Sequence, residues 1–365
     1  MSSPPSNTTA SDKKNISVPQ HCSVQADVES DFAFLKAPDG KLWVGIGPFE
    51  TAAEAPVESA FYINDFSLSD NEPWKIPRQL LSLNTEAAQE WAKKFRSFPR
   101  PQVNWKPLEP EWFEMVFRRI RKEVVARRLK KMVPVLTELG TKSRGDMISL
   151  VENVLSAPDS LAPYGRVVAD SGFIGATPEL LLNIAENSLE TMALAGTASP
   201  VHASGFTSDV KEIEEHEHVV SFMQAVLKEF GEVNRYPREV SDAAGLTHFR
   251  TRFSMTLDKS GLSLNDLIRS LHPTPAVGCL PRDDHQLEKL MEYRKQLNTP
   301  GFFGAPFGLK TGETFYSVVA IRGIGWEGDH VFMPSGCGIV GGSVFDHEWR
   351  ELGLKRDTVA RMLKV

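Results

Sequence analysis

The chain has 365 residues, of which 41% are hydrophobic and 24% charged, a composition typical of a soluble globular protein. Its formal net charge of −6 argues against a protein that wraps a nucleic-acid backbone or adsorbs to an anionic membrane. Three widely spaced cysteines, no long apolar run and no apolar N-terminal core predict a cytoplasmic protein without a disulfide framework, membrane span or signal peptide.

Taken in chain order, the sequence predicts a flexible tail over residues 1–25 and a single domain over residues 26–365. Strand patterns lie at 41–49, 58–66, 132–139, 165–175, 179–186, 188–196, 314–328 and 330–336. Helix patterns lie at 85–97, 109–131, 144–155, 208–231, 263–270, 283–297 and 346–364. Because the strands do not alternate strictly with helices, the order favours an α+β fold with large antiparallel sheets.

Three patterns suggest functions that the context does not support. Residues 336–341 match the glycine spacing of a dinucleotide-binding turn, but too little chain follows to complete a nucleotide-binding sheet. His216 and His218 lie two apart on a predicted helix and point to different faces, which disfavours a zinc site. The basic residues of 109–131 are interpreted as a solvated helix face.

Two pairs of glutamates share one spacing. Glu212 and Glu215 lie three apart on one predicted helix, and Glu348 and Glu351 lie three apart on another. Residues at this spacing share a helix face, so each pair presents two carboxylates together. Such pairs occur on solvated surfaces, but two of them converging would suit a hard divalent cation. Spacing alone leaves both interpretations open.

Six segments together resemble one family, the chorismate-utilising enzymes of menaquinone, siderophore and tryptophan biosynthesis. They are GFIGATPELLL, TMALAGT, KEIEEH, LHPTPAVG, SGCGIVGGS and EWRELGLK, and they occur in the family's order between about residue 110 and the C-terminus. The resemblance implies a single large α+β domain in which two antiparallel sheets pack as a sandwich flanked by helices. It also implies chorismate as the substrate.

The resemblance further implies the roles of individual residues. Lys131, which opens the strand after the basic helix, corresponds to the base that activates water, and Glu179 corresponds to the acid that protonates the departing hydroxyl. Lys122 lies too early and within the helix, and Lys130 is the adjacent alternative. The implied Mg²⁺ ligands are Glu212, Glu215, Glu348 and Glu351. The implied substrate-binding residues are Ala195, Gly196, Thr197, His248, Ala276, Arg322, Gly336 and Lys355.

Among the members of this family, the motifs are most similar to those of isochorismate synthases. Salicylate synthase, an amino-transferring relative and a non-catalytic chorismate-binding protein are the alternatives. Lys131 disfavours the amino-transferring alternative and its amidotransferase subunit, and we expect a monomer. Three departures from the family pattern concern substrate and product: Pro134 in the strand after Lys131, Phe303 where a tyrosine is common, and a shortened segment at 198–210.

Overall fold

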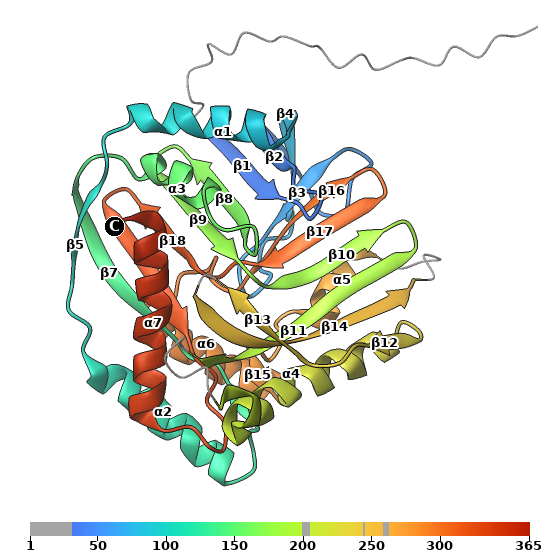
Figure 1. Ribbon diagram of the computed structural model, residues 1–365, viewed down its shortest axis with the longest axis vertical. Helices are drawn as coiled ribbons and strands as arrows, with labels where there is room; N and C mark the ends of the chain where they lie inside the picture. The colour runs from blue at the N-terminus through green and yellow to red at the C-terminus, as the bar shows by residue number, and fades with distance from the viewer. Residues whose placement is uncertain (1–30, 199–204, 244, 258–262) are drawn as a thin grey trace, which may run out of the picture.

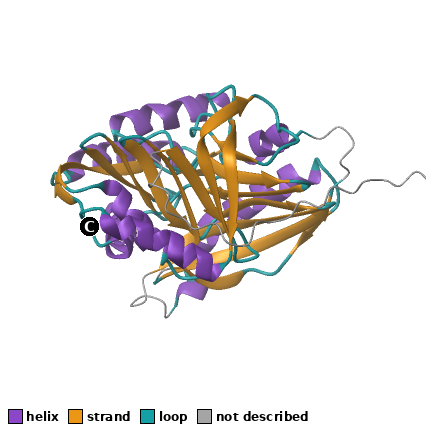
Figure 2. Ribbon diagram, turned by 90° about the horizontal axis from the view of Figure 1, so that it is seen from above, coloured by secondary structure: helices purple, strands orange, loops and turns teal. Residues whose placement is uncertain are grey.

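The computed structural model of the protein describes residues 31–198, 205–243, 245–257 and 263–365 (Figure 1). These residues form one α+β domain, as predicted, in which helices flank a body of strands (Figure 2). The predicted flexible tail and residues 199–204 of the shortened segment at 198–210 fall outside the described residues. Among the described helices, none is long and apolar enough to cross a membrane.

Most helices correspond closely to the predicted ones, but the helix predicted over 144–155 is reduced to a 3-10 turn at Met147–Leu150 and a short helix that follows it, with Arg144 ending a strand. The helices are α1 (Thr85–Lys93), α2 (Pro110–Val125), α3 (Val151–Leu155), α4 (Val210–Lys228), α5 (Leu264–Leu271), α6 (Asp284–Gln296) and α7 (Phe345–Leu363). The helix predicted over 109–131 ends early, because Ala126 leaves helical geometry and Arg127 adopts a left-handed backbone with φ of 58°. The chain is thereby free to enter a strand at Lys131.

The strands are more numerous than predicted. They are β1 (Asp31–Lys36), β2 (Leu42–Ala52), β3 (Ala60–Ile63), β4 (Trp74–Leu83), β5 (Gln102–Trp105), β6 (Lys131–Met132), β7 (Val135–Arg144), β8 (Ala162–Val168), β9 (Ser171–Thr177), β10 (Leu180–Ala185), β11 (Ser188–Ala198), β12 (Val233–Arg235), β13 (Glu239–Ala243), β14 (Leu246–Thr256), β15 (Cys279–Leu280), β16 (Pro306–Thr311), β17 (Thr314–Val319), β18 (Gly323–Glu327) and β19 (His330–Gly336). Within the described residues, seventeen of them join in one continuous antiparallel network, and β6 pairs separately with β15. The two expected layers are therefore linked through shared strands.

Three strand predictions need correction. The single strand predicted over 314–328 is two strands, β17 and β18, because the chain breaks before Gly323, where Arg322 takes a left-handed backbone with φ of 57°. The single strand predicted over 165–175 is a hairpin of β8 and β9, because Ala169 takes a left-handed backbone with φ of 51° at the turn. The strand predicted over 132–139 is interrupted at Pro134, which lies between β6 and β7. Proline has no N–H to donate to a ladder, and the interruption follows from that.

The two long helices that carry the glutamate pairs are held by apolar faces. Val219, Val220 and Met223 of α4 pack in the same core as strands β11 and β14, whereas the first turns of α4 are polar. Leu352 and Val359 similarly bury one side of α7, which runs beside β19 (Figure 1). Burial of these faces leaves Glu212, Glu215, Glu348 and Glu351 directed toward the space between the helices and the strand ends.

Candidate active site

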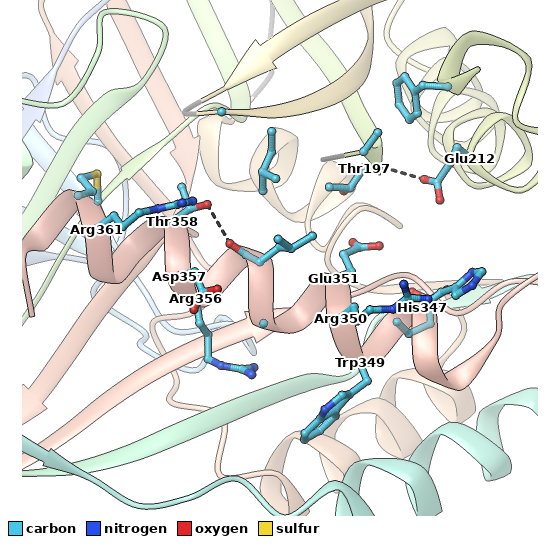
Figure 3. A pocket seen from close by; sticks show the side chains of 18 of the residues that line it. Thr197, Glu212, His347, Trp349, Arg350, Glu351, Arg356, Asp357, Thr358 and Arg361 are labelled. Carbon is cyan, nitrogen blue, oxygen red and sulfur yellow. Dashed lines mark hydrogen bonds between the residues drawn. The ribbon is translucent and has the colours of Figure 1, made fainter. Parts of the chain in front are cut away.

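Two neighbouring hollows lie where the strand ends meet α4 and α7. The outer cleft has a volume of about 1840 Å³, and Figure 3 shows Glu212 and Glu351 directed toward it. The inner pocket lies deeper, and Thr197 lines both hollows. All eight residues predicted to bind substrate line the inner pocket: Ala195, Gly196, Thr197, His248, Ala276, Arg322, Gly336 and Lys355. The sequence motifs therefore converge on one place.

Lys131 lies immediately behind the wall of the inner pocket. Its side chain is fully buried, and its Nζ lies 3.1 Å from Oε1 of Glu215, which does line the pocket. Burial opposes ionisation of Glu215, but the ammonium groups of Lys131 and Lys211 outweigh it and hold the pKa of Glu215 well below its usual range. Lys130 and Lys122 are exposed, and Lys122 lies within α2. Only Lys131 of these three lysines is placed to act at the pocket.

The wall between Lys131 and the pocket includes Gly338. A β-carbon at this position would lie 2.1 Å from Oε1 of Glu215 and 2.7 Å from Cε of Lys131. Such distances are far inside van der Waals contact, so no other residue fits without moving this ion pair. The glycine at position 338 therefore allows close packing around Lys131.

Glu179 lies in the inner pocket just after β9, where it is 4% exposed. Burial raises the pKa of Glu179 to about 7, although the positive charges of Lys131, Lys355 and Arg322 act in the opposite direction. A carboxyl group with this pKa is substantially protonated near neutral pH and can donate a proton.

Arg322 and His248 form a buried polar pair in the same pocket. Nη2 of Arg322 lies 3.1 Å from Nε2 of His248, and Nδ1 of His248 lies 2.9 Å from the carbonyl oxygen of Gly196. Burial and the neighbouring Arg322 lower the pKa of His248 to about 3, so the ring is neutral. The consistent arrangement has Nδ1–H donating to Gly196 and Nε2 accepting from the guanidinium, which fixes the direction of Arg322.

Backbone geometry at this pair is unusual. Arg322 has φ of 57°, a left-handed conformation that costs a non-glycine residue roughly 1–3 kcal/mol. Gly196, at a bulge in β11, has φ of 77°, and the bulge turns the N–H of Thr197 toward Oε2 of Glu212 at 2.7 Å (Figure 3). Both left-handed backbone conformations direct polar groups, the Arg322 guanidinium and the Thr197 N–H, into the site.

The four predicted metal ligands gather around Lys211, a residue that the sequence reasoning passed over. Its Nζ lies 2.9 Å from Glu212, 3.0 Å from Glu215 and 3.3 Å from Glu348. Glu351 lies beside them and forms an ion pair with Lys355, whose Nζ also donates to the carbonyl of Gly336 at 2.8 Å. The position of Lys211, four residues before Glu215 on one helix, was the available signal.

The chemistry of this cluster fits a magnesium ion. All of its donors are carboxylate oxygens, and Glu348 is 1% exposed with neither oxygen accepting a full hydrogen bond. Burial together with neighbouring carboxylates raises the pKa values of Glu212 and Glu348 to about 7, despite the opposing charge of Lys211. The cluster thus has more negative charge than Lys211 balances. Within the described ranges, however, no three acidic, histidine or cysteine side chains are already arranged as a metal-binding group.

Comparisons with known proteins find relatives that are isochorismate synthases. The salicylate biosynthesis isochorismate synthase of Pseudomonas aeruginosa is 32% identical over 208 residues, which are 52% of this chain and 42% of that protein. Isochorismate synthase EntC of Escherichia coli is 26% identical over 301 residues, covering 78% of this chain and 75% of that protein. The chain thus matches less than half the length of the Pseudomonas relative.

The fold is also found among solved structures. The structure of MenF, the menaquinone-specific isochorismate synthase from Escherichia coli, superposes with a TM-score of 0.73 at 17% identity, over 92% of this chain and 89% of that one. A family model described as chorismate binding enzyme matches residues 57–364. The chain therefore belongs to the chorismate-binding enzyme family.

Proposed function

We propose that this protein is a magnesium-dependent isochorismate synthase, which converts chorismate to isochorismate. The observation that carries the proposal is that two buried groups, the amine of Lys131 and the carboxyl of Glu179, lie at one pocket beside a cluster of four carboxylates. The names of the Pseudomonas and Escherichia coli relatives support the same reaction.

The proposed reaction exchanges one hydroxyl group for another. Once the ammonium group of Lys131 has lost its proton, the resulting amine takes a proton from a water molecule, and the oxygen of that water forms a bond to C2 of the ring. The ring double bonds shift, the C4–O bond breaks, and Glu179 donates its proton so that the C4 hydroxyl leaves as water. The proton on Lys131 and the proton lost by Glu179 balance over the cycle.

The positively charged side chains of the pocket would bind the dianionic substrate. Arg322, held by His248, has the fork geometry that pairs with a carboxylate through two hydrogen bonds. Lys355 adds a second positive charge, and Gly336 brings backbone close to the same place. Magnesium, held by Glu212, Glu215, Glu348 and Glu351, would neutralise the ring carboxylate of the substrate.

Product analysis tests the proposal against its alternatives. The purified protein is incubated with chorismate and MgCl₂, with and without ammonium, and the products are identified by mass spectrometry. Isochorismate without pyruvate is the expected result. Salicylate with pyruvate would indicate a salicylate synthase, and an amino product that needs ammonium would indicate an amino-transferring enzyme. Binding of chorismate without turnover would contradict any enzymatic role.

The raised pKa of Glu179 predicts the alkaline limit of activity. The carboxyl is protonated below about pH 7, so kcat should be largest there and fall about tenfold for each further pH unit above it. Glu179→Gln should lower kcat by roughly 10²–10⁴-fold and remove this alkaline limb. Glu138→Gln is the matched control, because burial also raises the pKa of Glu138 but its side chain lies outside the inner pocket. An unchanged pH profile in Glu179→Gln would contradict the acid assignment.

The pairing of His248 with Arg322 predicts a defect in substrate binding. His248→Leu leaves buried Nη2 of Arg322 without its acceptor, which costs about 1–3 kcal/mol. We expect KM for chorismate to rise by roughly 10- to 100-fold, with a smaller change in kcat. His248→Gln, which retains an acceptor, should restore part of the affinity. Equal loss of kcat in both variants, with KM unchanged, would show that His248 acts in another way.

A further inference from the structure

The ammonium group of Lys211 stands where the carboxylates of the site converge. It lies within 3.3 Å of three of the four, Glu212, Glu215 and Glu348, which come from two different helices. The fourth, Glu351, is paired with Lys355. A single positive charge thus bridges α4 and α7 at the centre of the cluster.

In this structure the carboxylates are arranged around the ammonium, at nitrogen–oxygen distances of 2.9, 3.0 and 3.3 Å. Carboxylates that hold magnesium lie about 2.0–2.1 Å from the ion, so they would have to close in for the metal to replace the ammonium. No group of described acidic, histidine or cysteine side chains has a metal-binding arrangement, although buried Glu348 has no full hydrogen bond. A magnesium ion among the same oxygens would bring a double positive charge next to the Lys211 ammonium.

We propose that Lys211 is a tethered cation that occupies the magnesium position in the metal-free enzyme and must swing out before the metal can bind. This inference rests on the magnesium dependence of the proposed function. Lys211 belongs to the first turn of α4, and its side chain is 18% exposed. It also lines the outer cleft, whose volume leaves room for four methylene groups and an ammonium to rotate into solvent.

Displacement of a side chain has a measurable consequence for affinity. If only a fraction of molecules has Lys211 swung out, the apparent dissociation constant for magnesium exceeds the intrinsic one by the inverse of that fraction. The Lys211 side chain therefore weakens metal binding. When no metal is present, its ammonium group neutralises part of the carboxylate charge and so keeps the carboxylates together.

Magnesium affinity, measured without substrate, tests this competition. MgCl₂ is titrated into metal-free protein and followed by isothermal calorimetry for the wild type, Lys211→Met and Lys228→Met. Methionine keeps the length of the side chain without the charge, and Lys228 is an exposed lysine at the other end of the same helix. We expect Lys211→Met to bind magnesium at least tenfold more tightly than the wild type, and Lys228→Met to match the wild type.

A second measurement uses the wild-type protein and does not depend on a variant that folds. Acetic anhydride labels exposed lysines, and mass spectrometry reports the extent at each site. Labelling of Lys211 should rise severalfold when MgCl₂ replaces EDTA, while labelling of Lys228 stays constant. Equal affinity in the three proteins, or unchanged labelling of Lys211 under saturating magnesium, overturns this inference alone. No magnesium binding to any of the proteins overturns it together with the metal requirement of the proposed function.

Discussion

Replacement of Lys131 by alanine should abolish the hydration of chorismate, with kcat falling by roughly 10²–10⁴-fold. The amine is the only one of the three candidate lysines that is buried beside the pocket, and its ion pair with Glu215 fixes its direction. Removing it also leaves Glu215 with one cation fewer. Breaking a buried ion pair costs about 3–5 kcal/mol, so the variant should unfold at lower denaturant concentration. Turnover and a urea unfolding curve measure the two effects.

The neighbouring lysine provides the control that separates them. Lys130→Ala removes an exposed amine one residue away and should leave both kcat and the free energy of unfolding unchanged within about 0.5 kcal/mol. Lys131→Met, which keeps more of the packing volume, should recover stability in part but not turnover. Isochorismate formation by Lys131→Met at the wild-type rate would refute the assignment of Lys131 as the base.

Gly338→Ala should be the most damaging single-methyl substitution at the site. The added β-carbon would come within 2.1 Å of Oε1 of Glu215 and 2.7 Å of Cε of Lys131, and both side chains are too buried to yield freely. Overpacking of this kind costs about 1–3 kcal/mol of stability. Because the displaced groups are the base and a proposed metal ligand, we expect kcat to fall by at least 10²-fold, as misplacement by about 1 Å can cause.

Gly341→Ala, in the same segment, is the comparison. Its β-carbon would meet nothing closer than Glu214 at 3.6 Å, an ordinary contact distance. We expect near wild-type turnover and stability for this variant. If the two substitutions behave alike in turnover and thermal unfolding, the segment matters through its backbone flexibility and not through the space beside Lys131.

Motif order and helix periodicity were sufficient to predict the family, the α+β class and α4 to α7 nearly to their ends. The missed strands have physical reasons. In β14, the buried residues Phe249, Thr251, Phe253 and Met255 alternate with polar ones, which is a period-two strand pattern. The strand was missed because the segment also contains a histidine and two arginines, which make it look like a polar loop. β4 contains a proline and is mostly half-exposed, so its apolar alternation is weak.

The site residues could be predicted because the resemblance to the family identified them. From spacing alone, both glutamate pairs could equally have been assigned to a solvated surface. Two contributors remained hidden. Lys211 stands directly before the first glutamate, and its spacing from Glu215 was a signal for a contact within one helix. Its contact with Glu348 on the other helix is evident only from the fold. Gly338 matters through a close approach between residues that are more than a hundred positions apart in the chain, which no local pattern encodes.

The continuous sheet has a consequence for how the protein folds. β3 pairs with β16, β1 with β8, and β6 with β15, so segments from early and late in the chain complete one another. Before such distant strands can pair, the chain must close long loops at a cost in conformational entropy, and the favourable contacts form only afterwards. Folding is therefore expected to be slow, and unpaired strand edges stay exposed until it is complete. We therefore expect catalytic competence to appear late in folding, once these long-range pairings have formed.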